Sequence, residues 1–457
     1  MEKRKVRARF RTIDFVNHRR LNSVLFFGCV RNPLRTHTYF IVDLWHSRCH
    51  VVEVSNLYTL GNFYRCLKAA ARNNYRRYHT FPLLRTLFQD GTYNIKQYGL
   101  LVGANIPHHC RYIGHRRFWI GNAGTHNAII CDLENQEVTS LTPTSEDDLL
   151  GPQISYDEAT DDVFFVTYST KGHLRKALVD PGFKNHFAIS KYHVATEQIE
   201  TLWAGDLDCL LVDGFRVTSD RRYGIFSDLR FALDEDYQFD PNSIYIVDLH
   251  EGNTTEVTGL KASAHIALDP DDPHVFYASE HQIGIIVKDK VTDADEAKNP
   301  DLALIARLKF VTKEIGGFVG VAAISKYRIT PDGPVQLGRF SDGKNFVRAT
   351  WHFVFKRRGR KYIATISSPY IVVIDAETMQ LHKKIDTGIK PVYGLEVSED
   401  GEEFYFNSFF DFYVIDFESG KISSSANLQK REEGRVFHVS AHTIRVDNFY
   451  SGLKDTG

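Results

Sequence analysis

The chain has 457 residues, of which 43% are hydrophobic and 25% charged, proportions typical of a soluble globular protein. Lysine and arginine (56) almost balance aspartate and glutamate (57), so the net charge of −1 creates no global field that would recruit nucleic acid or an anionic membrane. No apolar run approaches the roughly 20 residues that a membrane-spanning helix needs. The sequence therefore predicts neither a nucleic acid nor a membrane as partner.

The N-terminal segment is basic but lacks the apolar stretch that follows the charges of a signal peptide. No signal peptide is visible in this chain, and a mature form whose leader had been removed would look the same. The residues alone leave the compartment open.

One pattern recurs along the chain: a run of β-branched and aromatic residues, an aspartate, a polar turn and a second extended run. Aspartate is a common first residue of such a tight turn. Five copies contain Asp43, Asp132, Asp248, Asp375 and Asp416, and a looser copy has His193 in the same place. Copies spaced about 40–60 residues apart indicate the outer strands of successive β-propeller blades.

An inner pair of strands precedes each outer pair, and Val392–Ser408 is the cleanest example, with a Glu-Asp-Gly turn between two strands. Together the pairs predict seven blades, over Val6–Val54, Ile106–Leu141, Pro152–Trp203, Leu211–Val257, Ala264–Phe340, Arg348–Ile385 and Val392–Ser424. The leftover strand Arg435–Asp447 is expected to pair with the first blade and close the ring, which removes open sheet edges. We therefore predict an all-β fold, a single seven-bladed β-propeller over residues 1–457 with its closing strand at about 435–448.

One segment departs from the repeat. Leu57–Gln89 is rich in alanine and arginine and predicts a small helical insertion after the first blade, at about residues 57–90. We expect it to pack over the rim or one face of the disc.

Histidines concentrate in the second predicted blade. His108 and His109 begin its innermost strand, and His126 lies in the loop between its second and third strands. In a propeller these two positions face the same end of the central channel. Which of the two adjacent histidines faces the channel stays open.

Later blades place further histidines at equivalent positions, and neutral imidazoles are good ligands for transition metals. The candidate ligands of one metal ion, expected to be structural Zn²⁺, are His265, His281, His352 and His438, with His442 as a substitute for His438. The competing interpretation is a hydrogen-bonded polar channel without metal.

A second group belongs to the second, third and fourth blades: His109, His126, Tyr168, Arg216 and Tyr223. An imidazole base, a phenol that can exchange a proton and an arginine that offsets a carboxylate are the groups needed for β-elimination from a uronic acid. Tyr168 would deliver the proton to the leaving sugar.

In these features the sequence resembles the β-propeller polysaccharide lyases, ulvan lyases in particular, and Ser263–His281 also resembles the metal-binding blade of oligogalacturonate lyases. The resemblance implies that His109 and His126 form the histidine pair, that Tyr168 is the catalytic tyrosine, and that His265 and His352 bind metal. It also implies a uronate-containing, possibly sulphated polysaccharide such as ulvan as substrate, and a secreted or periplasmic protein whose leader has been removed. We also expect a monomer.

Two other classes stay open. A four-histidine centre also resembles that of carotenoid-cleaving dioxygenases, which would make the protein a metal-dependent oxidoreductase. A propeller that only binds a protein partner is the other alternative, although the outer strands lack the GH…WD signature of common scaffolding propellers.

Overall fold

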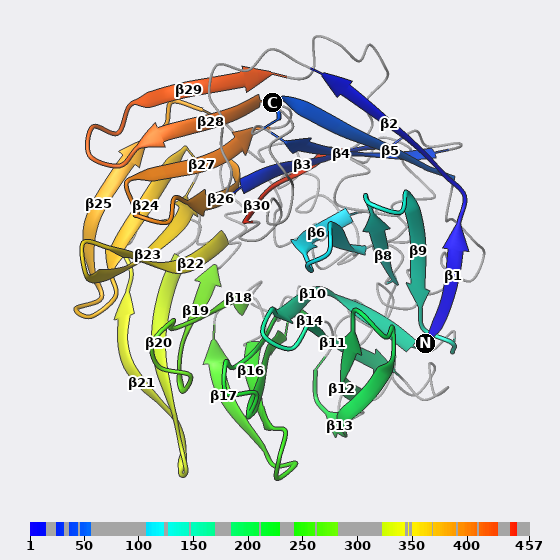
Figure 1. Cartoon of the computed structure of the whole chain (residues 1–457). Coiled ribbons are helices and arrows are strands. Elements are labelled where there is room, and N and C mark those ends of the chain that lie inside the picture. The colour runs from blue at the N-terminus through cyan, green and yellow to red at the C-terminus, as the bar shows by residue number, and fades with distance from the viewer. Residues whose placement is uncertain are drawn as a thin grey trace, which may run out of the picture.

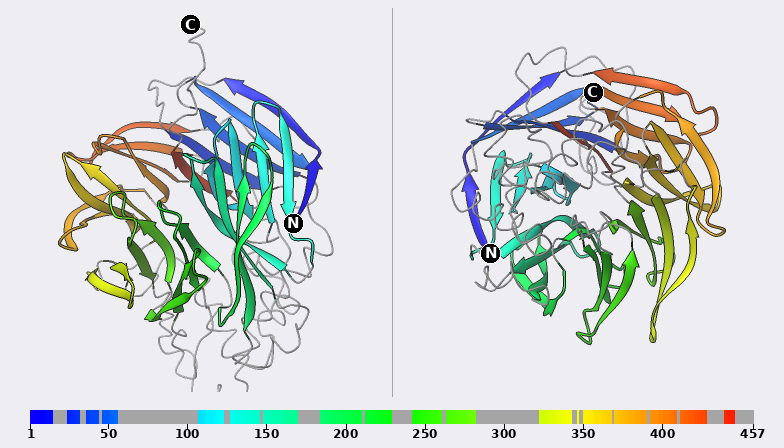
Figure 2. Two further views of the ribbon diagram at one scale, coloured as in Figure 1. Left: turned by 60° about the horizontal axis from the view of Figure 1, so that its bottom comes forward. Right: turned by 180° about the vertical axis from the view of Figure 1, so that it is seen from behind.

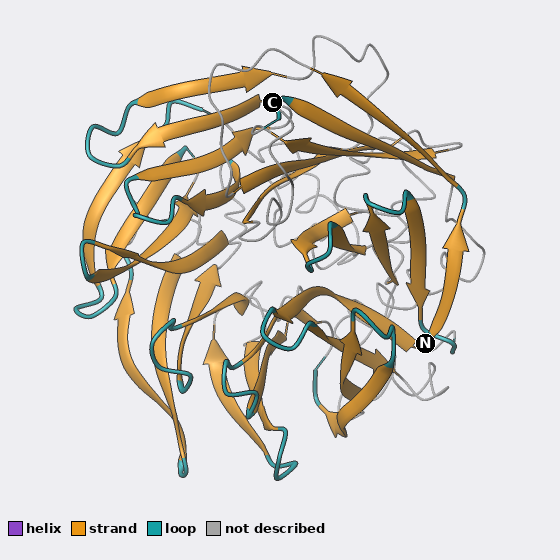
Figure 3. Ribbon diagram, viewed as in Figure 1, coloured by secondary structure: helices purple, strands orange, loops and turns teal. Residues whose placement is uncertain are grey.

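The computed structural model describes residues 1–14, 24–31, 36–43, 46–55, 107–122, 127–145, 148–169, 184–209, 212–228, 242–260, 263–281, 322–342, 346, 350–367, 369–389, 392–408, 411–427 and 439–445. Within these residues every regular element is a β-strand (Figure 3), and none is a helix that could span a membrane. The strands form seven antiparallel sheets arranged around one axis (Figure 1). The predicted all-β, seven-bladed propeller is confirmed, whereas the helical insertion at 57–90 lies outside the described residues.

Six blades each contain four strands that are consecutive in the chain. Blade 2 contains β6 (Pro107–Tyr112), β7 (Arg117–Asn122), β8 (Asn127–Asp132) and β9 (Glu137–Thr142), and blade 3 contains β10 (Asp148–Asp157), β11 (Asp162–Ser169), β12 (Asn185–His193) and β13 (Ile199–Leu207). Blade 4 contains β14 (Val212–Val217), β15 (Tyr223–Asp228), β16 (Asn242–Asp248) and β17 (Thr254–Leu260), and blade 5 contains β18 (Ser263–Leu268), β19 (Val275–His281), β20 (Ala322–Thr330) and β21 (Gly333–Phe340). Blade 6 contains β22 (Thr350–Arg357), β23 (Arg360–Ser367), β24 (Tyr370–Asp375) and β25 (Gln380–Asp386), and blade 7 contains β26 (Tyr393–Val397), β27 (Glu403–Ser408), β28 (Asp411–Asp416) and β29 (Ile422–Asn427).

Blade 1 joins the two ends of the chain. It contains β2 (Ala8–Asp14), β3 (Val24–Arg31), β4 (Thr36–Asp43) and β5 (Arg48–Ser55), with β30 (Val439–Arg445) as its innermost strand. Strand β30 pairs with β3 in a continuous register from Val24 opposite Arg445 to Val30 opposite Val439. It lies between the innermost strands of blades 7 and 2. The predicted closing strand is therefore confirmed.

The N-terminus makes a second closure that the sequence did not predict. Strand β1 (Glu2–Val6) pairs with β9 at the outer edge of blade 2, while β2 pairs with β5 at the outer edge of blade 1. Figure 2 shows the two strands running along the rim of neighbouring blades. The assignment of Val6–Val54 to one blade was wrong at its first residue, because β1 carries four charged residues in five positions and gives no apolar alternation.

The hydrophobic core is divided among the interfaces between neighbouring blades. One buried cluster, for example, joins Val166 and Phe187 of blade 3 to Phe215 and Phe226 of blade 4. Similar clusters join blades 1 and 2, 2 and 3, 4 and 5, 5 and 6, and 6 and 7. At these interfaces the sheets are thus covered by apolar side chains on the faces that meet, which leaves the polar side chains of the innermost strands to the axis.

The repeated aspartates begin the turns between third and fourth strands, as predicted. The Oδ1 atom of Asp132 accepts hydrogen bonds from the backbone N–H groups of Glu134 and Asn135 at 3.0 and 2.8 Å. Asp43, Asp248, Asp375 and Asp416 accept equivalent backbone bonds. In blade 3 His193 stands in the place of the aspartate, and its Nδ1 lies 3.0 Å from a carboxylate oxygen of Asp162 on the neighbouring strand.

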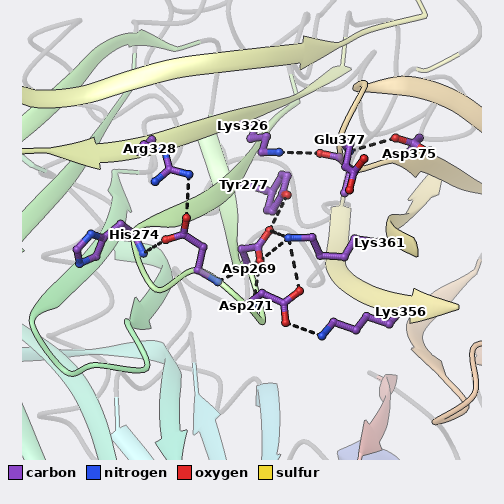
Figure 4. Close-up of polar contacts among 12 residues, drawn as sticks. Asp269, Asp271, His274, Tyr277, Lys326, Arg328, Lys356, Lys361, Asp375 and Glu377 are labelled. Carbon is purple, nitrogen blue, oxygen red and sulfur yellow. Dashed lines mark hydrogen bonds and ion pairs between the residues drawn. The ribbon is translucent and has the colours of Figure 1, made fainter. Parts of the chain in front are cut away.

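Ion pairs between neighbouring blades join the turns that connect first and second strands. Figure 4 shows the densest of them, between blades 5 and 6. Both carboxylate oxygens of Asp269 accept from Lys361 Nζ at 2.9 Å, and Tyr277 donates to Oδ2 at 3.0 Å. Burial raises the pKa of Asp269, but the bonds from Lys361, from the backbone of Asp271 and from Tyr277 outweigh that effect and lower it.

This buried pair gives a prediction for stability. Lys361→Met should lower the free energy of unfolding by about 3–5 kcal/mol, because it leaves the buried Asp269 carboxylate without its cation. The matched control is Lys356→Met, which breaks an exposed pair with Asp271 and should cost less than about 1 kcal/mol. Urea unfolding of the two variants measures the difference. Equal losses would contradict the argument from burial.

Candidate functional site

A cavity of about 200 Å³ lies among the innermost strands and is called the axial cavity below. Six blades contribute to its wall. The lining residues are His109, Cys110 and Arg111 of β6; Gln153 and Ile154 of β10; Arg216 of β14; His265, Ala267 and Leu268 of β18; His352, Phe353 and Val354 of β22; and Glu396 of β26. Polar and ionisable side chains from sequence positions far apart therefore share one cavity.

A repeated irregularity of the backbone turns these side chains toward the axis. In each of blades 2 to 7 the register between the first and second strands shifts near the start of the innermost strand. His265 and His352 lie within two of these bulges, and Gln153 lies within a third. A β-bulge re-aims the side chain that it carries and leaves a backbone N–H without a ladder partner. For His265, the hydroxyl of Ser279 accepts that N–H at 3.1 Å.

Three cavity side chains form a hydrogen-bonded chain. Arg216 Nη1 donates to Gln153 Oε1 at 3.2 Å, and Gln153 Nε2 lies 2.9 Å from His265 Nδ1. Because the amide oxygen faces the guanidinium, the amide nitrogen donates to His265, whose Nδ1 must accept. The neutral ring of His265 then carries its proton on Nε2. The rings of His265 and His109 meet edge to face, with centroids 5.9 Å apart.

Arg216 holds a positive charge that the wall only partly offsets. Its Nη1 also donates to the carbonyl oxygens of Phe215 and Ile154 at 2.6 and 3.3 Å, but within the described part of the chain Nε and Nη2 have no acceptor. Burial, and next the Arg111 cation, lower the pKa of Arg216 to about 9 against the opposing effect of Glu396. The group stays protonated at neutral pH, and the site favours an anion beside it.

His352 is held in one tautomer. Its Nε2 lies 3.1 Å from the carbonyl oxygen of Tyr277, so Nε2 must carry the proton and donate. The other nitrogen, Nδ1, is buried and has no hydrogen-bond partner among the residues that the structure describes. The pKa of His352 is lowered to about 4, chiefly by burial, which outweighs the opposing bond to the Tyr277 carbonyl and is reinforced by the Arg216 cation. The ring is therefore neutral near pH 7 and presents an acceptor lone pair.

The axial cavity brings together four of the predicted site residues and excludes two. His109, Arg216, His265 and His352 all line it. Tyr168 does not: it is 1% exposed in β11, stacked on Phe187 with centroids 5.5 Å apart, in the core between blades 3 and 4. Its expected position facing the channel was wrong, because strand alternation turns it, like Val166, toward the next blade.

Tyr223 also lies outside the cavity. It follows the turn between β14 and β15, where its ring meets that of His274 with centroids 5.7 Å apart and the guanidinium of Arg222 at 5.2 Å. Its expected place in the channel was wrong for a simple reason: it starts a second strand at the end opposite to the bulge. His126 and His438 lie outside the described residues, as do the side chains of His108, His281 and His442.

The zinc site stays a prediction. Among the residues that the structure describes, no group of three or more histidine, cysteine, aspartate or glutamate side chains is arranged to hold a metal ion. Gln153 occupies Nδ1 of His265 and the Tyr277 carbonyl occupies Nε2 of His352, so each ring offers one nitrogen at most. These contacts are those of a hydrogen-bonded polar channel.

Sequence reasoning missed Glu396 as a member of the site. It lines the cavity from β26, between the buried side chains of Leu395 and Val397. A lone carboxylate within an apolar innermost strand was the available signal, since the alternation of a strand places such a residue on the face opposite to its apolar neighbours.

Fold and site together define a class: a seven-bladed β-propeller with a cationic, histidine-lined cavity on its axis. Compared with known proteins, the sequence matches no family model and no curated protein. The geometry of the cavity therefore carries the functional argument.

Stability should depend on pH through the buried histidines. The pKa of His352 is about 4 in the folded chain, below the ordinary value of 6.5, so the unfolded chain binds more protons between these values. The stabilisation is complete above pH 6.5, falls as pH drops toward 4, and amounts to about 3 kcal/mol for His352. Burial likewise lowers the pKa of His50 to about 4.

Thermal melts between pH 7 and pH 4 measure this effect. Aspartates with a lowered pKa, such as Asp269, lose their contribution only as pH falls below their ordinary value of 3.8, so they act outside this window. A melting temperature that stays constant from pH 7 to pH 4 would contradict neutral buried imidazoles.

Proposed function

We propose that the protein is a polysaccharide lyase that cleaves a uronate-containing, possibly sulphated polysaccharide by β-elimination. The observation that supports this most is the pairing, in one cavity, of the Arg216 cation, whose Nε and Nη2 have no acceptor in the described part of the chain, with the imidazole of His109. A carboxylate anion makes the neighbouring C–H group much less acidic until its charge is offset. Arg216 would provide that offset and His109 the base.

The reaction balances without a second acid. His109 removes the proton from the carbon next to the carboxylate, the C–H electron pair forms the new C=C bond, and the bond from the next carbon to the linking oxygen breaks. The imidazolium of His109 then returns its proton to the leaving oxygen. One group acting first as base and then as acid replaces Tyr168, whose ring is buried in the blade core. His126 keeps its predicted partnership with His109.

The two alternatives receive less support. A four-histidine oxidoreductase needs its imidazoles around one metal, and the described histidines are instead tied to an amide and a carbonyl. A module that only binds another protein has no need of an arginine and three histidines on the wall of one axial cavity. Acidic polysaccharides of this kind occur outside the cytoplasm, so we place the protein, as a monomer, in a secreted or periplasmic setting.

Incubation with a panel of uronate polymers tests the proposal. Polygalacturonate, alginate, ulvan and a glycosaminoglycan would each be followed by ultraviolet absorbance, since β-elimination leaves a conjugated C=C–carboxylate at the new chain end. We expect at least one polymer to yield this absorbance, and His109→Gln to abolish it. Tyr168→Phe is the control and should stay active. If no polymer gives the unsaturated product, the protein is not a uronate lyase.

A further inference from the structure

The Nδ1 atom of His352 is a buried hydrogen-bond acceptor that lacks a donor among the described residues. The ring is 5% exposed, its Nε2–H is fixed on the Tyr277 carbonyl at 3.1 Å, and Nδ1 has no partner among the described residues. A buried acceptor without a donor is costly, and a ligand that supplies one recovers that cost. Because the ring is neutral near pH 7, it cannot serve as an anion site.

At another point of the cavity wall, the guanidinium of Arg216 favours binding of an anion. Arg216 keeps Nε and Nη2 without acceptors in the described part of the chain, and its cation acts electrostatically on His352. A guanidinium binds carboxylate and phosphate groups through two parallel hydrogen bonds, and of these the substrate class proposed above carries the carboxylate. A ligand that satisfies both points must carry a carboxylate and, a short distance away, a hydroxyl or N–H group.

The cavity is large enough for such a ligand. Its volume of about 200 Å³ far exceeds the roughly 10–15 Å³ that one water molecule needs on the same measure. That space accommodates one sugar ring. Gln153 and His265 add polar groups to the same wall, as a polyhydroxylated ring requires.

We infer that the axial cavity binds a single sugar-acid unit, with its carboxylate on Arg216 and one of its hydroxyl groups donating to Nδ1 of His352. This assignment rests on the proposed function for its substrate class. It adds His352 as a residue that determines specificity, because sugar acids that lack the donor hydroxyl leave its lone pair buried and unpaired. His352 neither gives nor accepts a proton in the proposed reaction.

Calorimetric titration with monosaccharides tests the inference on the full chain. Galacturonate and glucuronate carry both groups, galactose and glucose lack the carboxylate, and cyclohexanecarboxylate lacks the hydroxyls. We expect at least one uronate to bind and the other two classes to bind at least tenfold more weakly. A series of monodeoxy uronates then identifies the hydroxyl, whose removal should weaken binding by about tenfold.

His352→Gln is the matched variant. Its amide N–H can still donate to the Tyr277 carbonyl, but the variant lacks the Nδ1 lone pair. Binding of the uronate should weaken by about tenfold, and the decisive deoxy analogue should bind the variant and the wild type equally. His50→Gln is the control, since burial lowers the pKa of this histidine to the same value but it lies on β5, away from the cavity wall.

Each outcome decides one point. If no single hydroxyl of the uronate affects its binding to the wild-type protein, or if His352→Gln binds the uronate normally, the role assigned to His352 is wrong. The deoxy series uses the wild-type protein alone, so it tests this role even if the variant does not fold. If Zn²⁺ binds stoichiometrically and its removal abolishes uronate binding, Nδ1 of His352 serves a metal ion and the inference is overturned. Uronate binding with no unsaturated product from any polymer would sustain this inference and refute the lyase.

Discussion

Arg216→Gln should lower kcat/KM on a uronate polymer by about 10²–10³-fold, the usual cost of removing one group that stabilises developing negative charge. The substrate carboxylate is charged before the reaction and gains charge as the proton leaves, so KM should rise and kcat should fall together. Glutamine can keep the contact to Gln153, which limits the change to the loss of the cation.

Arg216→Lys separates charge from geometry. Lysine restores a positive charge but not the two parallel donors of a guanidinium, so activity should recover only in part. The exposed Arg360, paired with Asp375 on the outer part of blade 6, supplies a control, and Arg360→Gln should leave kcat/KM unchanged. A fully active Arg216→Gln would remove the basis of the proposed chemistry.

The second large effect concerns the closure of the ring. A chain that ends at Asn427 lacks β30, so blade 1 loses its innermost strand and β3 loses a ladder of seven paired residues. The gap would lie between the innermost strands of blades 7 and 2, and exposed strand edges of this kind promote aggregation. We expect the truncated chain to lose its cooperative thermal transition, which circular dichroism measures directly.

Two controls bracket that result. A chain that ends at residue 447 keeps β30 and should melt as the full chain does. A synthetic peptide spanning residues 435–448, added to the truncated chain, should restore part of the transition by pairing with β3. If the chain ending at Asn427 melts cooperatively at the wild-type temperature, β30 is dispensable and the closure described above does not hold the ring together.

The features predicted from sequence are those that local chemistry determines. Aspartates such as Asp132 and Asp375 begin tight turns through bonds to backbone two and three residues ahead, so the turns could be read without knowing the fold. The spacing of those turns then gave the number of blades. The orphan strand at the C-terminus predicted the closure, because an unpaired strand edge is unfavourable.

The features that escaped prediction depend on contacts between distant segments. Tyr168 and His109 look alike in sequence, each polar and each near a strand end, but Tyr168 faces the core between blades and His109 faces the axis. The innermost strand that carries His109 has a bulge just before it, and a bulge is one residue of register that no pattern of apolar residues reveals. The position of β1 was hidden likewise, since its partner β9 lies more than a hundred residues away.

A crystal structure of the protein soaked with a uronate disaccharide tests the central claim most directly. The account predicts one sugar ring inside the axial cavity, its carboxylate within hydrogen-bond distance of the Arg216 guanidinium and a hydroxyl within reach of His352 Nδ1. His109 should lie beside the carbon that carries the carboxylate. Sugar bound only on the rim of the disc, with none in the cavity at a concentration that saturates turnover, would contradict it.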